Sequence, residues 1–261
     1  MQFKTLVGNT PLIKIDDQIY GKLEAYNPTG SVKDRMVSYI VENAINAGRI
    51  TSTTILVEAT SGNTGISLSA ICAELGLRVM IIMPSDMSSE RKQMMRLFGA
   101  QIIDAPPGDF ETAIKMRDNL LKDKKYWSPM QFSNKLNIEC HKLTTGPEVY
   151  RQIGDTWDYF VHGAGTGGTI IGIKQFTQEA NLDIKFFLTV PASDNHGIQG
   201  IGDGKDFLVN RNEMDDIVEV DTNDAINEAK AFAKKSGITV GISSGANILA
   251  AKQILKNRHV S

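Results

Sequence analysis

This chain of 261 residues has little of several features that would mark a specialised class of protein. It has only two cysteines, Cys72 and Cys140, which form no CxxC pair. Their number excludes a cysteine-built metal site, and we expect them to be reduced, buried thiols of a cytoplasmic protein. The four histidines show no HxxxH or HExxH spacing, so we assign no metal.

An excess of charge of one sign and long hydrophobic runs are also lacking. The 28 basic and 30 acidic residues leave a net charge of −2, which gives no sign of the basic surface that nucleic-acid binding favours. No apolar run approaches the roughly 18 residues of a membrane span, and the first residues lack the apolar core of a signal peptide. The composition is that of an ordinary globular protein.

Strand-like and helix-like segments instead alternate along the chain. Strands are expected at 55–59, 78–83, 100–103, 160–161, 185–190 and 217–220. Helices are expected from the turn at Lys33 to about Gly48, and at 65–75, 88–98, 109–122, 224–235 and 244–256. This alternation, with short Gly/Pro joints, predicts an α/β fold with mostly parallel sheets covered by helices. In such sheets ligands bind where strands end and helices begin.

The most informative segment, 27–35, is a Pro/Gly turn that places Lys33 in the first turn of a helix. Ser31 is expected to be the N-cap, with Asp34 three residues later as a weak capping box. The positive end of the helix dipole disfavours an ammonium group and favours a neutral amine, which can form a Schiff base. An isolated lysine of this kind is usually a surface residue, but the neighbouring motifs favour the chemical role.

Three further junctions are rich in Gly, Ser, Thr and Asn. Segment 60–65 presents hydroxyls and the first free amides of a helix, which suit a small carboxylate. Segment 163–168 matches GxGxxG, and its glycine turn forms a nest for a phosphate. A dinucleotide site would need an acidic residue at the end of the next strand, but 188–191 has none. The last junction, 241–246, is expected to join a strand to a helix.

A reactive lysine, a phosphate nest, a carboxylate loop and a late serine suit one cofactor, pyridoxal 5′-phosphate. These motifs resemble those of the cysteine synthase (O-acetylserine sulfhydrylase) family of fold-type-II pyridoxal-phosphate enzymes, and the match runs nearly end to end. It rests on segments 8–12, 27–35, 60–65, 83–91, 131–132, 144–148, 165–169 and 241–245. Segments 83–100 and 143–146 are nearer to the B-type synthases.

The resemblance implies a two-lobed fold similar to the tryptophan synthase β chain. A smaller mobile domain would cover 35–136, and a larger domain with the phosphate site would cover 1–34 and 137–261. Lys33 would bind the cofactor's aldehyde and later remove the substrate's α-proton, while Asn63 would hydrogen-bond the ring oxygen. The substrate carboxylate would be bound by Thr60, Ser61, Thr64 and Gln131. The cofactor phosphate would be bound by Gly165, Thr166, Gly167, Gly168 and Thr169.

Ser243 would face the pyridine nitrogen. A neutral hydroxyl does not keep that nitrogen protonated as an aspartate does, so the ring is a weaker electron sink that suits elimination of a good leaving group. The resemblance implies that sulfide replaces the acetoxy group of O-acetyl-L-serine through an aminoacrylate, giving L-cysteine and acetate. It also implies a homodimer, with serine acetyltransferase as a possible partner.

Other functions stay open at this point. A cystathionine β-synthase-like or serine/threonine dehydratase activity shares the lysine and the glycine nest, although segment 60–64 with Gln131 and Phe132 favours cysteine synthesis. The family usually continues past 259–261 with a further strand and an Asp-x-Gly-x-Arg-Tyr segment, so a non-catalytic cofactor-binding scaffold is a third possibility. Asp203 follows Gly202 where some relatives carry arginines, which predicts a preference for the acetyl ester over O-phosphoserine.

Overall fold

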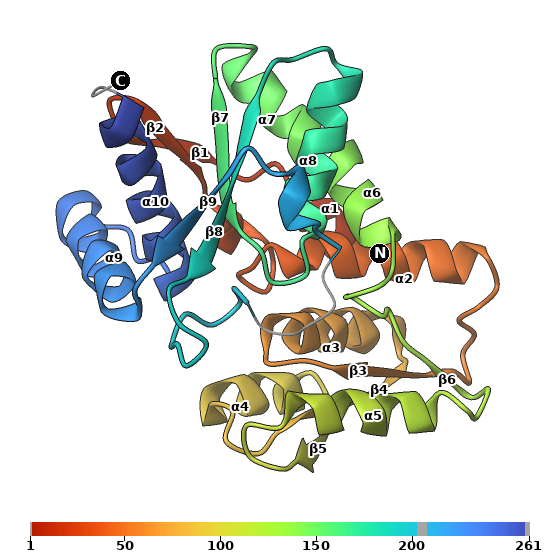
Figure 1. Cartoon of the computed structure of the whole chain (residues 1–261). Helices are drawn as coiled ribbons and strands as arrows, with labels where there is room; N and C mark the ends of the chain where they lie inside the picture. Colours follow the sequence, from red (N-terminus) through yellow and green to blue (C-terminus); the bar gives the residue numbers. More distant parts are fainter. Residues whose placement is uncertain (1, 203–207, 259–261) are drawn as a thin grey trace. The chain divides into compact units, whose positions relative to one another are not determined.

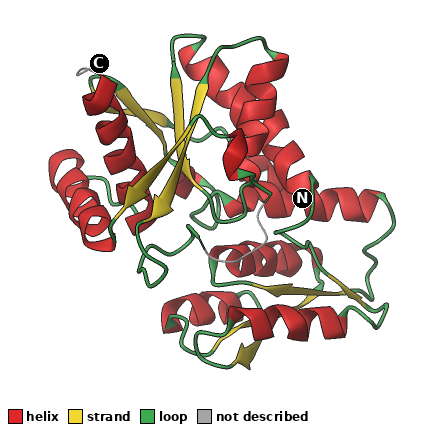
Figure 2. Ribbon diagram, viewed as in Figure 1, coloured by secondary structure: helices red, strands yellow, loops and turns green. Residues whose placement is uncertain are grey.

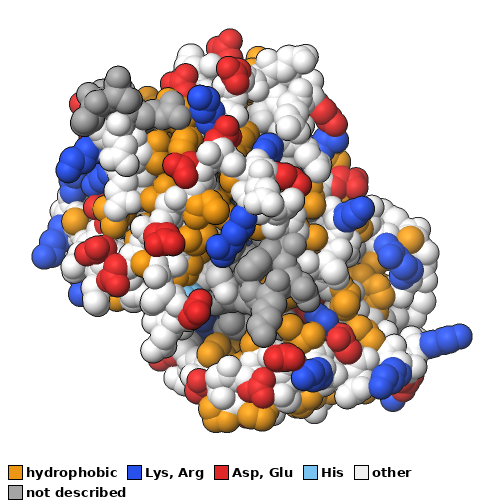
Figure 3. Space-filling view, viewed as in Figure 1, with side chains coloured by type: hydrophobic (Ala, Val, Ile, Leu, Met, Phe, Trp, Pro, Cys, Tyr) orange, Lys and Arg blue, Asp and Glu red, His pale blue; other side chains and the backbone are white. Residues whose placement is uncertain are grey.

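The computed structural model describes residues 2–202 and 208–258 (Figure 1). The chain forms two compact units, one of Met1–Pro11 and Leu23–Cys140 and the other of Leu12–Lys22 and His141–Ser261. Among the described residues, no helix is long and apolar enough to span a bilayer. On the face shown in Figure 3, acidic and basic side chains are interspersed, as the nearly balanced charge leads one to expect.

The first unit is built on a parallel sheet with the strand order β5-β4-β3-β6. Its strands are β3 (Ile55–Ala59), β4 (Arg78–Pro84), β5 (Gln101–Ala105) and β6 (Tyr126–Trp127). Its helices are α1 (Gln2–Leu6), α2 (Lys33–Asn46), α3 (Asn63–Leu75), α4 (Ser89–Leu97), α5 (Phe110–Leu120) and most of α6 (Leu136–Leu143), with a short 3-10 helix at Glu24–Tyr26.

Both faces of this sheet are covered, so its central strands β3 and β4 are mostly apolar and do not alternate with polar residues. Leu56 and Ile81 pack into a core with side chains of α2, α3 and α4. Val57 and Ile82, their neighbours along the strands, point to the opposite face and pack with Ala113 of α5. This arrangement places the carboxyl end of β3 beside the start of α3.

The second unit contains a parallel sheet in the order β7-β8-β9 and an antiparallel hairpin, β1-β2 (Figure 2). The strands are β1 (Leu12–Asp16), β2 (Ile19–Lys22), β7 (Tyr159–Gly163), β8 (Lys185–Pro191) and β9 (Asp216–Val220). The helices are α7 (Thr145–Ile153), α8 (Gly168–Glu179), α9 (Thr222–Ser236) and α10 (Ile242–Arg258), with a 3-10 helix at Arg211–Glu213. Ala246 and Ala250 of α10 share a core with Val220 and Ala225.

The α/β class and the parallel sheets are confirmed, but two junctions differ from expectation. Helix α3 begins at Asn63, two residues before the expected start, because the polar segment 63–65 is already helical. No strand precedes α10, since residues 237–241 lie in neither a helix nor a strand and simply connect α9 to α10. The domain boundaries expected from the resemblance concern which part moves, and they stay a prediction.

Candidate active site

Lys33 is the first residue of α2 and is half-buried, as the turn at 27–35 predicts. The expected cap was wrong in detail, because Val32 is the N-cap residue and no side chain caps the helix. The Ser31 hydroxyl instead accepts a hydrogen bond from the Lys33 backbone N–H at 3.3 Å. The Asp34 carboxylate reaches back to Thr29, accepting from its N–H at 2.7 Å and from its hydroxyl at 2.5 Å. The lysine turn is therefore closed by the residue that follows the lysine.

Asp34 is fully buried, and this burial raises the pKa of its carboxyl group above the ordinary value. The hydrogen bonds from Thr29 act in the opposite direction, because they stabilise the ionised form. These bonds give the buried carboxyl group local partners at the start of α2.

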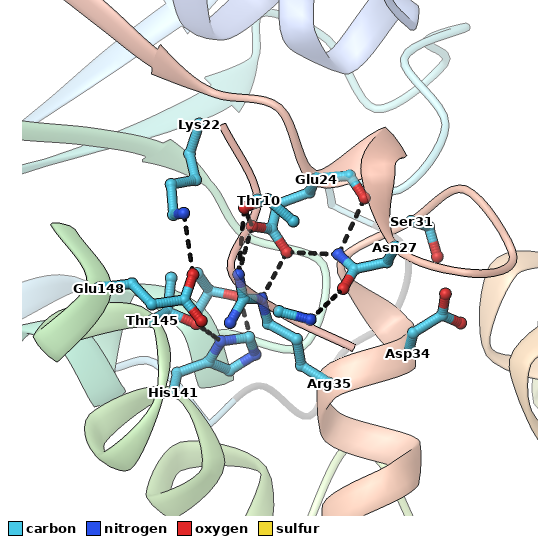
Figure 4. Close-up of polar contacts among 12 residues, drawn as sticks. Thr10, Lys22, Glu24, Asn27, Ser31, Asp34, Arg35, His141, Thr145 and Glu148 are labelled. Atoms are coloured by element: carbon cyan, nitrogen blue, oxygen red, sulfur yellow. Dashed lines mark hydrogen bonds and ion pairs between the residues drawn. The ribbon is translucent and has the colours of Figure 1, made fainter. Parts of the chain in front are cut away.

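A second polar cluster adjoins both ends of segment 27–35 and centres on the Glu24 carboxylate (Figure 4). Glu24 accepts from Arg35 Nε at 2.6 Å and Nη2 at 2.9 Å, and from the Thr10 hydroxyl at 2.7 Å. Asn27 Nδ2 donates to the same carboxylate at 2.8 Å, while Asn27 Oδ1 accepts from Gly8 N–H at 2.8 Å. Segment 8–10 therefore anchors the turn at its first residue, and Arg35 anchors it two residues beyond the lysine.

The structure brings together three of the expected carboxylate-binding residues, all in the first unit. The Thr64 hydroxyl donates to Gln131 Oε1 at 2.6 Å, and Gln131 Nε2 donates to the Ala59 carbonyl at 3.4 Å. The Thr60 hydroxyl accepts from Gly62 N–H at 3.1 Å, at the end of β3. These groups meet at the N-terminus of α3, whose first backbone N–H groups have no partners within the helix and favour an anion.

The remaining expected residues of this segment are more accessible. Ser61 is half-buried, and the Asn63 side chain is exposed at the first position of α3. Lys33, Thr60, Ser61, Asn63, Thr64 and Gln131 all belong to the first unit.

A buried ion pair between Glu58 and Arg117 holds the backbone of Gln131 through a hydrogen bond, and our sequence reasoning missed it. Glu58 of β3 is 0% exposed and Arg117 of α5 is 5% exposed, and Arg117 Nη1 donates to Glu58 Oε1 at 2.9 Å. Glu58 also accepts from the N–H groups of Ala59 at 2.9 Å and Gln131 at 3.3 Å. Burial raises the pKa of Glu58, although Arg117 favours its ionised form. A single charge inside the apolar run 55–59 was the signal that could have revealed it.

The glycine-rich segment 163–169, which is the expected phosphate loop, begins at the end of β7 in the second unit. Gly167 is the N-cap of α8 in the left-handed conformation, with φ +88°, and Gly168 and Thr169 form the first turn of the helix. Two backbone bonds support the loop, from Gly202 N–H to the Ala164 carbonyl at 3.0 Å and from Leu208 N–H to the Thr166 carbonyl at 2.8 Å.

Two of the loop glycines could not carry a side chain. A Cβ on Gly165 would lie 2.6 Å from the Gly200 carbonyl oxygen, and a Cβ on Gly167 would lie 2.7 Å from Val209 N. Segment 163–169 contains no acidic residue, and it ends in the N–H groups and the hydroxyls of the α8 terminus. A dianionic phosphate fits such a nest.

His141, like Glu58 and Arg117, is a residue whose role the sequence did not reveal. It is 2% exposed, its Nδ1 lies 2.8 Å from the Thr145 hydroxyl, and its Nε2 lies 3.2 Å from the Thr169 hydroxyl. The imidazole thus connects Thr145 to Thr169, in the loop that is expected to bind phosphate. Thr145 belongs to segment 144–148, and Glu148 of this segment forms an ion pair with Lys22 of β2, with 2.8 Å between Lys22 Nζ and Glu148 Oε2 (Figure 4).

Ser243 is the second residue of α10 and is half-buried. Asn247, one turn later in α10, accepts a hydrogen bond from Gly163 N–H at 2.8 Å. Because Gly163 ends β7, this bond connects the start of α10 to the strand that leads into the phosphate loop.

Comparison with known proteins identifies the class to which this chain belongs. The family described as "Pyridoxal-phosphate dependent enzyme" matches residues 3–261. Cysteine synthase B of Campylobacter jejuni is 39% identical, over 96% of this chain and 89% of that protein.

Two solved structures share the fold closely. A hydrogen sulfide-producing enzyme from Fusobacterium nucleatum has a TM-score of 0.92 and 37% identity, over 98% of this chain and 92% of that one. An O-acetylserine dependent cystathionine beta-synthase from Helicobacter pylori has a TM-score of 0.92 and 30% identity, over 98% of this chain and 90% of that one. The chain therefore belongs to the cysteine synthase family of pyridoxal-phosphate-dependent enzymes.

A side chain at position 167 would be strained at φ +88° and would clash with Val209 N, which leads to a testable expectation. Gly167→Ala should lower the affinity for pyridoxal phosphate by about tenfold or more, because the added Cβ displaces the loop amides from the anion. Gly237→Ala is the matched control, because Gly237 has φ +72° but nothing within 4 Å of an added Cβ. It should cost about 1 to 2 kcal/mol of stability through strain and leave cofactor affinity unchanged. Titration with pyridoxal phosphate, followed by absorbance, measures the cofactor affinity of both variants. Equal affinities would contradict the assignment of this loop as the phosphate site.

Proposed function

We propose that this enzyme is a cysteine synthase that replaces the acetoxy group of O-acetyl-L-serine by sulfide, releasing L-cysteine and acetate. The observation that carries the proposal is the cluster of Thr60, Thr64 and Gln131 at the N-terminus of α3. This cluster offers hydroxyl, amide and backbone N–H groups to the carboxylate of an amino acid. The membership in the cysteine synthase family supports the choice of reaction.

Each expected residue has a role in this proposal. Lys33 Nζ would hold the cofactor through its aldehyde carbon and would remove the α-proton of the bound amino acid. Pyridoxal phosphate supplies an electron sink for the substrate's α-carbon when it is bound. The carboxylate is held by Thr60, Ser61, Thr64 and Gln131. The cofactor would be held by Asn63 at the ring oxygen, by Ser243 at the ring nitrogen and by Gly165, Thr166, Gly167, Gly168 and Thr169 at the phosphate.

Acetate leaves from the β-carbon in the first half-reaction, and the sulfur of sulfide bonds to the same carbon in the second. Lys33 holds the proton that the α-carbon loses and returns it to that carbon when cysteine forms. The two half-reactions share no ternary complex, so we expect ping-pong kinetics.

The experiment that tests the proposal compares amino-acid and sulfur substrates on the same preparation. O-acetylserine with sulfide should show a kcat/KM at least about tenfold above serine with homocysteine, serine alone or O-phosphoserine with sulfide. Cysteine, cystathionine, pyruvate and phosphate are measured as the respective products. A preference for serine alone would identify a dehydratase, and the absence of any turnover with cofactor bound would identify a scaffold.

One observation favours a second candidate. The Helicobacter pylori protein with a similar fold is an O-acetylserine dependent cystathionine beta-synthase. O-acetylserine with homocysteine is therefore a further arm of the assay. A higher kcat/KM with homocysteine than with sulfide would make cystathionine the product.

We also propose a cytoplasmic homodimer that can bind serine acetyltransferase, with residues 35–136 as the mobile domain. Cys72 and Cys140 are buried and form no disulfide, which supports a reducing compartment. Burial raises the pKa of Cys72 to about 12, so this thiol is protonated and unreactive at neutral pH. Asp203, on which the preference over O-phosphoserine rests, and segment 259–261 lie outside the described residues.

A further inference from the structure

We propose that Arg91 is a positioning residue that holds the carboxylate-binding turn in its binding shape. The inference rests on the proposed function of that turn and assigns the means by which its backbone is held. Arg91 is the last residue of segment 83–91, to which the proposed reaction assigns no role. It lies in α4 and is half-buried.

The start of α4 aims this arginine at the turn. Ser88 is the N-cap of α4, and its hydroxyl accepts a hydrogen bond from Arg91 N–H at 3.4 Å. The Arg91 guanidinium then donates from Nη1 to the Ser61 carbonyl at 3.2 Å. The cap and the guanidinium bond together join α4 to the segment between β3 and α3.

Gly62 makes this approach possible. A Cβ built on Gly62 would lie 2.7 Å from Arg91 Cδ, 2.8 Å from Nε and 3.0 Å from Cζ. The arginine side chain therefore lies directly against the backbone of the turn. Any side chain at position 62 would have to push the guanidinium away from the Ser61 carbonyl.

The peptide between Ser61 and Gly62 is held at both ends. Its carbonyl oxygen accepts from Arg91, while its N–H donates to the Thr60 hydroxyl at 3.1 Å. The Gly62 carbonyl in turn accepts from Ile66 N–H at 3.0 Å, within the first turn of α3. With the peptide held in this way, the next N–H groups, those of Asn63 and Thr64, are presented at the helix terminus.

The guanidinium also places a positive charge beside the turn, and arginine keeps its charge at every accessible pH. Shape and charge therefore act in the same direction, toward an anionic group. Loss of Arg91 should weaken the binding of the amino-acid substrate and leave the sulfide step unaffected. A residue that served only to pack α4 against α3 would lower stability without separating the two half-reactions.

The first experiment replaces Arg91 and uses another arginine of α4 as the control. Arg91→Ala should lower kcat/KM for O-acetylserine by about tenfold or more, while kcat/KM for sulfide stays within about twofold. Arg91→Lys should recover only part of the loss, because lysine keeps the charge but not the planar fork. Arg96→Ala, at an exposed position of the same helix, should match the wild type in both constants.

The second experiment tests whether Gly62 and Arg91 act through one contact. Gly62→Ala should reproduce the loss seen for Arg91→Ala, and the double variant should be no worse than either single variant. A double variant in which the two losses multiply would show that they act independently and would overturn the proposal. Equal reductions of both kcat/KM values in Arg91→Ala would overturn it as well.

A binding measurement keeps this test separate from that of the reaction. L-serine carries the same carboxylate without the ester, and its binding to the holoenzyme is followed by the change in cofactor absorbance. Arg91→Ala should raise its Kd by about tenfold, whether or not the wild type turns over O-acetylserine. An unchanged Kd would refute the positioning role of Arg91, whereas a wild type that does not turn over O-acetylserine would refute only the proposed reaction.

Discussion

Lys33→Ala should reduce the rate of cysteine formation by at least about 10⁴-fold, because the variant loses both the covalent attachment of the cofactor and the base. The purified variant should also lack the visible absorption band that we expect for the wild type with pyridoxal phosphate. Lys33→Arg should be as inactive as the alanine variant, because a guanidinium keeps the charge but is not deprotonated in proteins. The rate is measured with O-acetylserine and sulfide at saturating concentrations.

The fold should survive these substitutions, which makes the loss of activity interpretable. The lysine turn is closed by the bonds from Thr29 to Asp34 and from Arg35 to Glu24, and neither substitution replaces any of these residues. Lys115→Ala is the matched control, since Lys115 is an exposed lysine that forms an ion pair with Glu111 on α5. It should keep full activity and the absorption band. An active Lys33→Ala variant would refute the assignment of the lysine.

The second large effect is expected from the buried ion pair. Arg117→Ala should lower the free energy of unfolding by about 3 to 5 kcal/mol, because it leaves the Glu58 carboxylate buried without its counter-charge. Adding Glu58→Gln to this variant should recover part of the loss, because the unpaired charge is then removed. The exposed pair gives the control, and Lys115→Ala should change stability by less than about 1 kcal/mol.

The measurement has to report on the first unit alone, because two compact units need not unfold in one step. The chain has two tryptophans, Trp127 in the first unit and Trp157 in the second. In a Trp157→Phe background, the fluorescence of Trp127 follows the unfolding of the first unit in urea. A loss no larger than that of Lys115→Ala would show that the pair contributes little. In that case, Glu58 would tolerate burial without Arg117.

Much of the fold was accessible from local patterns. The apolar runs at 55–59 and 185–190 are strands because buried parallel strands need a continuous apolar sequence, and that is visible without knowing their neighbours. Helix ends were less accessible. Ser31 has the chemistry of a cap, but Val32 is already in the helical region, and the Asp34 carboxylate is used by Thr29 instead. That choice depends on three-dimensional geometry that residue types do not specify.

By itself, the sequence determined the α/β class, the place of Lys33 in the first turn of a helix and the glycine turn before α8, because each depends on residues adjacent in the chain. Only the tertiary structure decided which distant side chains support them. Arg35 meets Glu24, Arg117 meets Glu58, and His141 meets Thr169 across 11, 59 and 28 positions. Such pairings follow from the packing of whole strands and helices, so no local spacing in the chain encodes them.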